Sequence, residues 1–446
     1  MTRKELSECT RRSFLGRALA AGAAASALTI IKPELVRGAG KERLRAGLVG
    51  CGGRGTGAAI DLLTADPNVE LVSMGDIFED KLQQSLANLR NPEFLMSAGP
   101  KRAAEFTGQP LAELVDSVRK RVNVDPEHCF SSFDAYRKVI ATDVDVVLLC
   151  TPPGHRHEQF EAAIIAGKHV FTEKPIATDP VGTRRFIAAV KKAEESKLTV
   201  VAGTQRRSQK DYIETVRKIR DGVIGEVVEL SANYLSGPVL HVDHRDPAWG
   251  DMEWQHRNWY SFVWICGDQM VEQHIHTLDF CNWVMGTHPV SAVASGGVAW
   301  RPREELYGNI YDHLTADFVY PNGVHLYSAC RQFPKGCYRK VWNTVVGSKR
   351  RSDGTDMGTK GLDPQVQEHV RLVNSIRGDS PYVNDGMPVA ESTMTCIMGR
   401  EAAYSGMEIT WDMIMASKQD LQPKTLDYKL AMAVPPVAVP AQYEFV

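Results

Sequence analysis

The chain is 446 residues long, which is enough for two domains with full-sized hydrophobic cores. Its 52 Lys and Arg residues nearly balance its 54 Asp and Glu residues, for a formal net charge of −2. This balance gives no reason to expect a nucleic acid or an anionic membrane surface as a partner. Nine cysteines without a Cys-x-x-Cys pair do not indicate a disulfide scaffold.

The first 40 residues have the pattern of an export signal. Residues 10–16 read Thr-Arg-Arg-Ser-Phe-Leu-Gly, a twin-arginine sequence, and an uncharged, Ala-rich stretch follows over 18–31. That stretch is shorter than the ~20 apolar residues that cross a bilayer, and Ala25 and Ala27 offer a cleavage site. We therefore expect residues 1–40 to be a twin-arginine signal and linker, and the protein to be periplasmic or otherwise exported. No later segment is apolar enough to predict an integral membrane segment.

The first patterned unit after this leader predicts a dinucleotide-binding turn. A strand over 44–49 leads into Gly-Cys-Gly-Gly-Arg-Gly at 50–55, which has the G-x-G-x-x-G spacing, and a helix is expected over 56–64. In this fingerprint the first Gly permits a tight turn, and the second lets the backbone approach a pyrophosphate. The third Gly lets the helix pack closely on the strand, with its N-terminus facing the phosphates.

A carboxylate at the end of the next strand indicates which dinucleotide is bound. The strand is expected over 69–74, and Asp76 follows it about 20 residues beyond the last Gly of the turn. A carboxylate there accepts hydrogen bonds from a ribose 2′-OH and repels a 2′-phosphate, so we expect NAD rather than NADP. Arg54, inside the turn, is the residue that could weaken this preference.

Strands and helices continue to alternate beyond this unit. Residues 79–126 are helical and polar with several prolines, which predicts a surface insertion. Parallel strands are expected over 145–150, 169–172 and 198–202, with a helix over 158–166. Extended segments that predict a larger, mostly antiparallel sheet lie over 227–235, 290–300, 312–320, 323–330 and 340–346. The Pro-rich residues after about 430 predict an extended arm.

Three further motifs carry a family resemblance. They are Thr-Pro-Pro-Gly-His-Arg-His at 151–157, Gly-Lys-His-Val-Phe-Thr-Glu-Lys-Pro at 167–175 and Glu-Gln-His-Ile-His-Thr-Leu-Asp at 272–279. From about residue 43 to residue 411 the chain resembles the Gfo/Idh/MocA family of sugar and cyclitol oxidoreductases. The resemblance implies an α/β protein with two domains, and a substrate in the cleft between them.

These two domains would be an N-terminal Rossmann domain over 41–204 and a C-terminal α/β domain over 205–446. The second domain would carry the large, open, mostly antiparallel sheet, and in the family this sheet supports homo-oligomers. We therefore expect a dimer or a tetramer.

The resemblance also implies the catalytic residues. His276 matches the family's catalytic His, a proton acceptor whose ordinary pKa of ~6.5 suits this work at neutral pH. Lys174 matches the family's Lys, whose ammonium would stabilise developing alkoxide charge near the nicotinamide. Where many relatives carry Asp, this chain has Glu272. Positions 272 and 276 share a face if they lie on one helix, so this carboxylate could orient His276 or bind a substrate hydroxyl.

The other candidate residues fall into a cofactor set and a substrate set. By pattern or family position, the cofactor would contact Gly50, Gly52, Gly53, Arg54, Gly55, Asp76, Thr151, Pro152, His157, Glu173 and Lys174. The stretch over 241–264 combines aromatic rings with fork-like donors, as carbohydrate sites do, although packing at a subunit interface is the alternative. The candidate substrate contacts are Gln205, Arg206, His241, His244, Asn258, Trp259, Tyr260 and His274, with Tyr327 and Arg331 as further candidates. His274 could instead make a structural hydrogen bond.

Several of these side chains are also possible metal ligands. The group comprises Glu272, His274, His276, His241 and His244. None of their spacings matches H-E-x-x-H or a comparable zinc motif, so we expect no metal.

Together these patterns predict an NAD(P)-dependent oxidoreductase that acts on a hydroxyl of a sugar, glycoside or cyclitol. An exported enzyme has no obvious pool of free NAD, so we expect the cofactor to be tightly bound and restored in each cycle. Two sugar substrates could alternate for this purpose. A redox-neutral glycosidase is the alternative, with transient oxidation at C3, elimination of the aglycone, addition of water and return of the hydride. A third reading is a nucleotide-binding protein without turnover.

Overall fold

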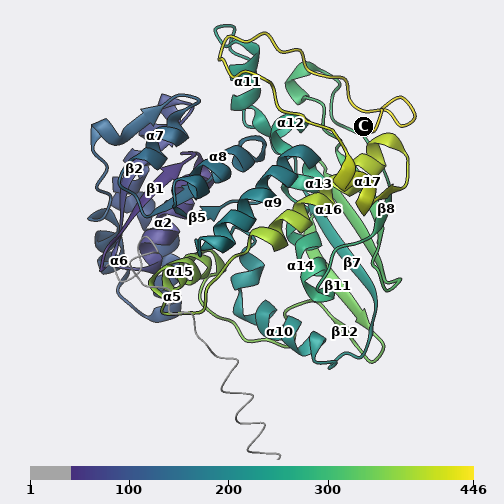
Figure 1. Cartoon of the computed structure of the whole chain (residues 1–446), viewed down its shortest axis with the longest axis horizontal. Helices are drawn as coiled ribbons and strands as arrows, with labels where there is room; N and C mark the ends of the chain where they lie inside the picture. Colours follow the sequence, from purple (N-terminus) through teal and green to yellow (C-terminus); the bar gives the residue numbers. More distant parts are fainter. Residues whose placement is uncertain (1–41) are drawn as a thin grey trace, which may run out of the picture. The chain divides into compact units, whose positions relative to one another are not determined.

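The computed structural model describes residues 42–446, so the predicted twin-arginine signal and linker lie outside the described residues (Figure 1). Two sheets organise the described chain, one in each half of the sequence. None of the helices in this part of the chain combines the length and the apolar character that a membrane span requires.

The first sheet has six parallel strands in the order β3-β2-β1-β4-β5-β6, which is the order of a dinucleotide-binding Rossmann domain. The strands are β1 (Leu44–Val49), β2 (Val69–Asp76), β3 (Cys129–Ser131), β4 (Val146–Leu149), β5 (His169–Thr172) and β6 (Val200–Ala202). Five of them confirm the predicted strands, whereas β3 was not predicted. The strand order reverses between β1 and β4, and open α/β sheets bind ligands at the carboxyl ends of the strands beside such a point.

Two helices around this sheet begin earlier than predicted, because the motif residues themselves form the first turns. Helix α2 (Gly53–Ala65) starts inside the glycine turn, and α8 (Pro153–Ile165) starts inside the motif that follows β4. Pro153 at the start of α8 has the fixed φ angle that suits a first helical position. The predicted starts at residues 56 and 158 were therefore too late.

Both faces of the Rossmann sheet are covered by helices. One face carries α2 and the helices of the 79–126 stretch, which are α3 (Glu79–Arg90), α4 (Pro92–Leu95), α5 (Gly99–Thr107) and α6 (Leu111–Arg119). This stretch is broken as predicted, but it is more than a surface insertion because Leu82, Leu89 and Val118 complete the core. The other face carries α7 (Ala135–Ala141), α8 and α9 (Pro180–Glu195).

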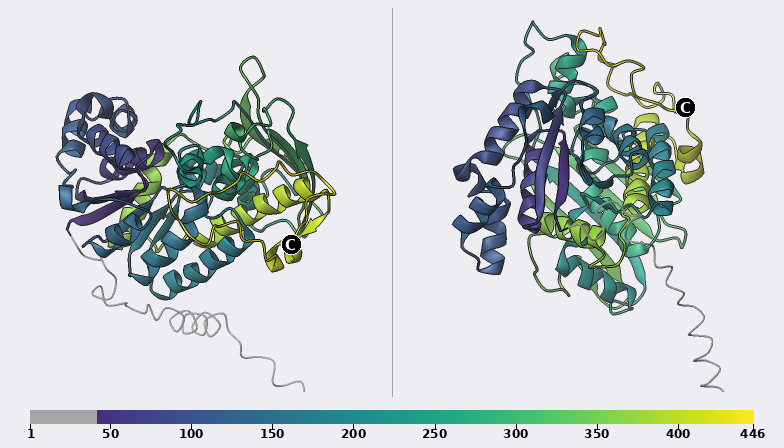
Figure 2. Two further views of the ribbon diagram at one scale, coloured as in Figure 1. Left: turned by 90° about the horizontal axis from the view of Figure 1, so that it is seen from above. Right: turned by 60° about the vertical axis from the view of Figure 1, so that its left-hand side comes forward.

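A helix from late in the sequence completes the Rossmann core. Helix α15 (Pro364–Arg377) packs against α2, and its Leu372, Val373 and Ile376 are buried with the residues of β1 and β2. Figure 2 shows this light green helix next to the purple strands. The chain therefore returns to the first domain after it has built the second sheet.

The second sheet has seven strands in the order β12-β11-β7-β10-β9-β8-β13. Its strands are β7 (Val227–Ser236), β8 (Ser291–Gly297), β9 (His313–Val319), β10 (His325–Gln332), β11 (Lys340–Gly347), β12 (Arg351–Ser352) and β13 (Ile409–Thr410). Only β7 and β10 pair in parallel, which confirms the mostly antiparallel sheet. The inner face packs against α14 (Ile275–Met285) and α16 (Gly386–Ser405), and this layer forms the largest core.

The remaining elements are helices and turns that lie between or after these strands. They are α10 (Lys210–Arg220), α11 (Asp251–Arg257), α12 (Val263–Cys266), α13 (Gln269–Glu272), α17 (Trp411–Ala416) and the 3-10 turns η2 (Pro126–His128), η3 (Gln205–Ser208), η4 (Trp259–Ser261) and η5 (Glu305–Tyr307). After α17 the chain is extended, as predicted for the arm, and it packs on the protein itself. Figure 1 shows this yellow segment passing beside α11.

Candidate active site

A cavity of about 880 Å³ opens at the carboxyl ends of the Rossmann strands and is closed on its other side by residues 241–276. Most of the predicted cofactor and catalytic residues line it. They are Gly50, Gly52, Gly53, Arg54, Gly55, Asp76, Thr151, Pro152, Glu173, Lys174, Glu272 and His276. Of the predicted substrate contacts, Gln205, His241 and Trp259 line the same cavity, and the ring of His241 stacks on that of Trp259 at a centroid distance of 5.3 Å.

The glycine turn has the geometry that a pyrophosphate requires. Gly50 has a φ angle of +92°, and a Cβ atom there would lie 2.6 Å from the backbone nitrogen of Thr151. A Cβ atom on Gly55 would overlap the carbonyl oxygen of Gly50, so α2 could not pack as closely on β1. By contrast, Cβ atoms on Gly52 and Gly53 would meet nothing within 4 Å. The turn thus holds open space directly at the N-terminus of α2, where a phosphate group binds favourably.

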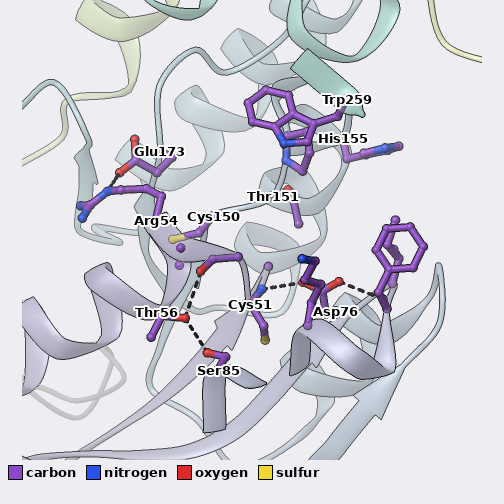
Figure 3. A pocket seen from close by; sticks show the side chains of 18 of the residues that line it. Cys51, Arg54, Thr56, Asp76, Ser85, Cys150, Thr151, His155, Glu173 and Trp259 are labelled. Atoms are coloured by element: carbon purple, nitrogen blue, oxygen red, sulfur yellow. Dashed lines mark hydrogen bonds and ion pairs between the residues drawn. The ribbon is translucent and has the colours of Figure 1, made fainter. Parts of the chain in front are cut away.

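Asp76 fixes this turn from the end of β2. Its Oδ2 atom accepts a hydrogen bond from the backbone N–H of Cys51 at 2.6 Å, and its Oδ1 atom accepts one from Phe78 at 2.9 Å (Figure 3). Burial raises the pKa of the Asp76 carboxyl, and these two hydrogen bonds oppose that effect. The carboxylate remains on the cavity wall, in the position from which such a group binds a ribose hydroxyl.

Arg54 is held on the opposite side of the turn from Asp76 (Figure 3). Its guanidinium donates to Glu173, to Asp61 at 3.3 Å and to Glu368 of α15 at 3.2 Å. Burial opposes its charge, but the three carboxylates outweigh burial and raise the pKa of Arg54. The hydrogen bonds of Arg54 go to these three carboxylates and not to Asp76, so Arg54 does not neutralise the Asp76 carboxylate. The contacts of Arg54 therefore give no reason to expect NADP rather than NAD.

Three polar side chains converge at the other end of the cavity. Lys174, which follows β5, donates from Nζ to the backbone oxygen of Glu272 at 2.6 Å and to its Oε1 atom at 3.0 Å. The other carboxylate oxygen of Glu272 and the Nδ1 atom of His276 have no hydrogen-bond partner within residues 42–446. Unpaired polar atoms inside a protein are costly, so they mark a place where a polar ligand can bind.

The expectation that positions 272 and 276 share one helix face is wrong. Helix α13 ends at Glu272 and α14 begins at Ile275, because the N–H of His274 bonds back to the carbonyl of Gln269 in a wider turn. Glu272 therefore pairs with Lys174, and no hydrogen bond joins it to His276. The three groups still line one cavity, but Lys174 rather than the imidazole holds the carboxylate.

The local charges favour a neutral imidazole. Burial and then the Lys174 cation hold the pKa of His276 well below its usual value, so the ring is unprotonated at neutral pH and can accept a proton. Burial raises the pKa of Glu272, and the Lys174 cation opposes this shift. The site thus combines a fixed cation, a carboxylate with one free oxygen and a neutral base.

The structure does not bring the other substrate candidates to the cavity wall. His274 is buried, and its Nε2 and Nδ1 atoms lie 2.7 Å from the hydroxyl groups of Ser328 and Thr277 respectively. This residue therefore makes the structural hydrogen bonds that were the alternative to a substrate contact. Arg206 donates to Asn343 at 2.6 Å on the sheet side. The remaining candidates outside the cavity are His244, Asn258, Tyr260, Tyr327 and Arg331.

Each of these residues has a different surrounding. His244 is exposed beside Asp243, whereas Asn258 donates to the carbonyl of Leu306 at 2.8 Å. Tyr260 is buried next to the cavity wall without lining it. Tyr327 is half-exposed on β10, and Arg331 of the same strand donates to the carbonyl of Tyr338 at 3.0 Å.

The predicted cofactor residue His157 also lies outside the cavity. It is buried in α8, and a Cβ atom on Gly182 of α9 would lie 3.0 Å from its Nδ1 atom, so the ring packs between the two helices. Its neighbour His155 faces the cavity instead and lies 2.9 Å from His256 of α11.

Sequence reasoning missed several residues of the cavity wall. Glu368 and Leu426 line it from two segments of the second half of the chain. No local motif surrounds either of them, and only the fold brings them to the glycine turn. Phe78 and Phe133 follow β2 and β3 and could have been found as the residues just beyond strand ends.

Among the residues that the structure describes, no metal-ligating set comes together at this site. Within residues 42–446, the group of His, Cys, Asp and Glu side chains that could hold an ion is Asp125, Glu127 and His128, near the surface and away from the cavity.

Comparison with known proteins places these observations in a family. Residues 44–202 match an oxidoreductase family with an NAD-binding Rossmann fold, and residues 212–351 match the Gfo/Idh/MocA C-terminal domain. The chain belongs to the Gfo/Idh/MocA family. Its first domain is therefore an NAD-binding Rossmann domain, and the open glycine turn and the Asp76 carboxylate fit that cofactor.

Relatives of this Gfo/Idh/MocA chain include cyclitol dehydrogenases. It is 28% identical over 158 residues to inositol 2-dehydrogenase from Rhizobium meliloti, covering 35% of this chain and 42% of that protein. It is 33% identical over 203 residues to an inositol 2-dehydrogenase/D-chiro-inositol 3-dehydrogenase from Halalkalibacterium halodurans, covering 44% and 49%. The matches thus span less than half of these relatives.

A solved structure extends the likeness to both domains of the fold. The WlbA dehydrogenase from Bordetella pertussis, in complex with NADH and UDP-GlcNAcA, superposes with a TM-score of 0.60 at 19% identity. The superposition covers 82% of this chain and 98% of that one.

Proposed function

We propose that this protein is an NAD-dependent oxidoreductase that acts on a hydroxyl group of a sugar, glycoside or cyclitol. One observation carries the proposal: Lys174, Glu272 and His276 converge, with unpartnered polar atoms, on the cavity that also contains the dinucleotide turn. The cyclitol dehydrogenases among its relatives support the substrate class.

The side chains can share the work of removing a proton from a hydroxyl group. The neutral imidazole of His276 accepts the proton, because burial and then the Lys174 cation hold its pKa low and keep the ring unprotonated. The same cation stabilises negative charge on the substrate oxygen. The free oxygen of Glu272 accepts a hydrogen bond from a neighbouring hydroxyl of the substrate. NAD, when bound at the glycine turn, supplies the hydride acceptor.

A redox-neutral glycosidase is the second candidate, and the twin-arginine sequence at residues 10–16 favours it. We propose that the protein is exported with its cofactor bound, and a cofactor that does not exchange must be restored in each cycle. Oxidation of one sugar coupled to reduction of another meets this requirement. Transient oxidation of a glycoside, followed by elimination, hydration and reduction, also meets it.

Incubation of the holoenzyme with aryl glycosides distinguishes these cycles. Release of the aglycone without net change of the nicotinamide indicates the glycosidase. Accumulation of a keto sugar together with an equal amount of bound NADH contradicts the glycosidase and supports the dehydrogenase.

Replacement of His276 tests the catalytic assignment. We expect His276→Ala to lower kcat by about 10²- to 10⁴-fold, the usual contribution of a general base, and to leave nucleotide binding unchanged. His244→Ala is the matched control, because this exposed side chain lies outside the cavity and its loss should not change turnover. Turnover in His276→Ala equal to that of the unmodified enzyme would contradict a catalytic role for His276. Unchanged physiology in a strain that carries this variant would favour a nucleotide-binding protein without turnover.

A further inference from the structure

A segment near the C-terminus crosses from the second domain to the dinucleotide site. We call residues 419–434 the strap. Its first part is anchored at the start of α9, where the backbone N–H of Leu421 donates to Asp179 at 3.2 Å. The side chain of Gln422 donates to the hydroxyl of Thr178 at 3.1 Å. The strap is thus tied to the Rossmann domain before it reaches the cavity.

The middle of the strap lies against the residues that follow β2 and β3. Leu426 lines the cavity, and the hydroxyl of Tyr428 donates to the backbone carbonyl of Ile77. The Tyr428 ring packs at 4.5 Å from the ring of Phe133 and at 6.2 Å from that of Phe78. Ile77 and Phe78 directly follow Asp76, so the strap covers the ribose end of the dinucleotide site.

Helix α11 also contacts the Rossmann domain at the ribose end of the dinucleotide site. The guanidinium of Arg257 lies 3.9 Å above the ring of Phe78 and pairs with Asp80 at 3.3 Å. The preceding residue, His256, stacks on His155 of α8, and the Nε2 atoms of the two rings are 2.9 Å apart. Both pairs join α11 to the Rossmann domain across the cavity wall.

The strap and α11 support each other. The N–H of Met252 donates to the carbonyl of Leu430 at 3.3 Å, and Asp251 accepts the N–H of Met432 at 2.8 Å. A Cβ atom on Gly250 would overlap the backbone of Tyr428, so the two segments are in close contact. They therefore form one covering layer.

We infer that this layer, through Tyr428 and Arg257, is part of the dinucleotide site and retains the cofactor through the catalytic cycle. The inference rests on the proposed NAD-dependent function. A dinucleotide bound beside Asp76 lies beneath three separate contacts, at Ile77, at Phe78 with Asp80, and at His155. Release requires these contacts to open together, so dissociation is slow even where each contact alone is weak.

Release of labelled NAD from the purified holoenzyme tests this inference. The protein is loaded with labelled NAD, excess unlabelled NAD is added, and the label retained per chain is followed with time. We expect Tyr428→Ala and Arg257→Ala each to accelerate release by about tenfold or more, since changes at a binding site act mainly on dissociation. Tyr428→Phe keeps the ring but loses the hydrogen bond to Ile77, so its release rate should lie between those of Tyr428→Ala and the unmodified protein.

Tyr338→Ala, an exposed side chain away from the cavity, is the control and should not change release. Unchanged release in Tyr428→Phe and in the Tyr428→Ala, Arg257→Ala double variant, with thermal unfolding like that of the control, overturns the inference. If the unmodified protein binds NAD but exchanges it as fast as the variants do, only the role of the strap fails. If it binds no dinucleotide at all, the proposed function fails first.

Discussion

Lys174 and His276 line the same cavity, and the charge of Lys174 lowers the pKa of His276 in addition to the effect of burial. The Lys174 cation is fixed by Glu272, and the His276 ring lies in the same cavity without a hydrogen-bond partner among the described residues. A cation that stabilises an alkoxide also disfavours protonation of a nearby imidazole. In the proposed reaction, one charge therefore acts both on the oxygen of the substrate and on the base that takes its proton.

This arrangement predicts the pH dependence of the reaction. The base must be unprotonated, and its pKa lies below the ordinary value of 6.5, so activity persists as the pH falls through that value. We expect the acid limb of kcat/KM to be centred below pH 6.5. The measurement is the pH profile of kcat/KM over the range in which the protein stays folded. An acid limb centred above pH 6.5 would contradict the described surroundings of His276.

At the scale of single residues, the sequence predicted the motif residues of the cavity better than it predicted the other residues of the cavity wall. Lys174 and His276 lie in motifs of fixed spacing, and both line the cavity. Asn258 and His274 have side chains of the kind that bind sugars, but their hydrogen bonds go to a backbone carbonyl and to a hydroxyl group inside the protein. Residue type does not tell which side of a short, irregular segment faces a cavity, and α11 to α13 are such segments.

At the scale of elements, we expect substitutions at Gly55 and Gly53 of the glycine turn to have different effects, one on stability and the other on NAD binding. In Gly55→Ala the new methyl group would overlap the Gly50 carbonyl, and we expect a loss of about 3 kcal/mol of stability. In Gly53→Ala the methyl group meets only open space, so the fold should remain stable while NAD binding weakens. Thermal unfolding and NAD titration of both variants measure the two effects. Equal NAD affinity in Gly53→Ala and the unmodified protein would show that the phosphates do not approach this turn.

The elements themselves were predictable where the pattern was local. The glycine turn, the buried strand β4 and the alternating strands of the second sheet each have a periodic signal in one short window. Strand β3 has three residues, none of them fully buried, so it has no such signal. The place of α15 in the Rossmann core was not predictable, because its amphipathic pattern indicates a helix but not the sheet on which it packs.

At the scale of the whole molecule, the outer face of the second sheet is the candidate surface for the expected homo-oligomer. Val293 and Tyr327 are about half exposed, at 49% and 50%, and each pairs with Asp317 on the strand between them. We propose that a second copy of the chain packs on this face. Light scattering should give a dimer or tetramer for the unmodified protein and a smaller particle for the Val293→Lys, Tyr327→Lys double variant.

Ile165→Lys is the control for this experiment, because Ile165 is an exposed apolar residue on the Rossmann domain. It should leave the mass unchanged. A monomeric unmodified protein, or a double variant of unchanged mass, would show that this face is not the interface.

We propose that the carbon bearing a hydroxyl of a sugar or cyclitol gives its hydride to NAD at the site of Lys174, Glu272 and His276, while the hydroxyl loses its proton. The most direct test mixes the NAD-loaded protein with a panel of sugars, glycosides and cyclitols and follows the absorbance of reduced nicotinamide in the first turnover. We predict rapid reduction by at least one compound, slower when its reacting carbon bears deuterium, and absent in His276→Ala. No reduction of the bound NAD by any member of the panel would contradict the account.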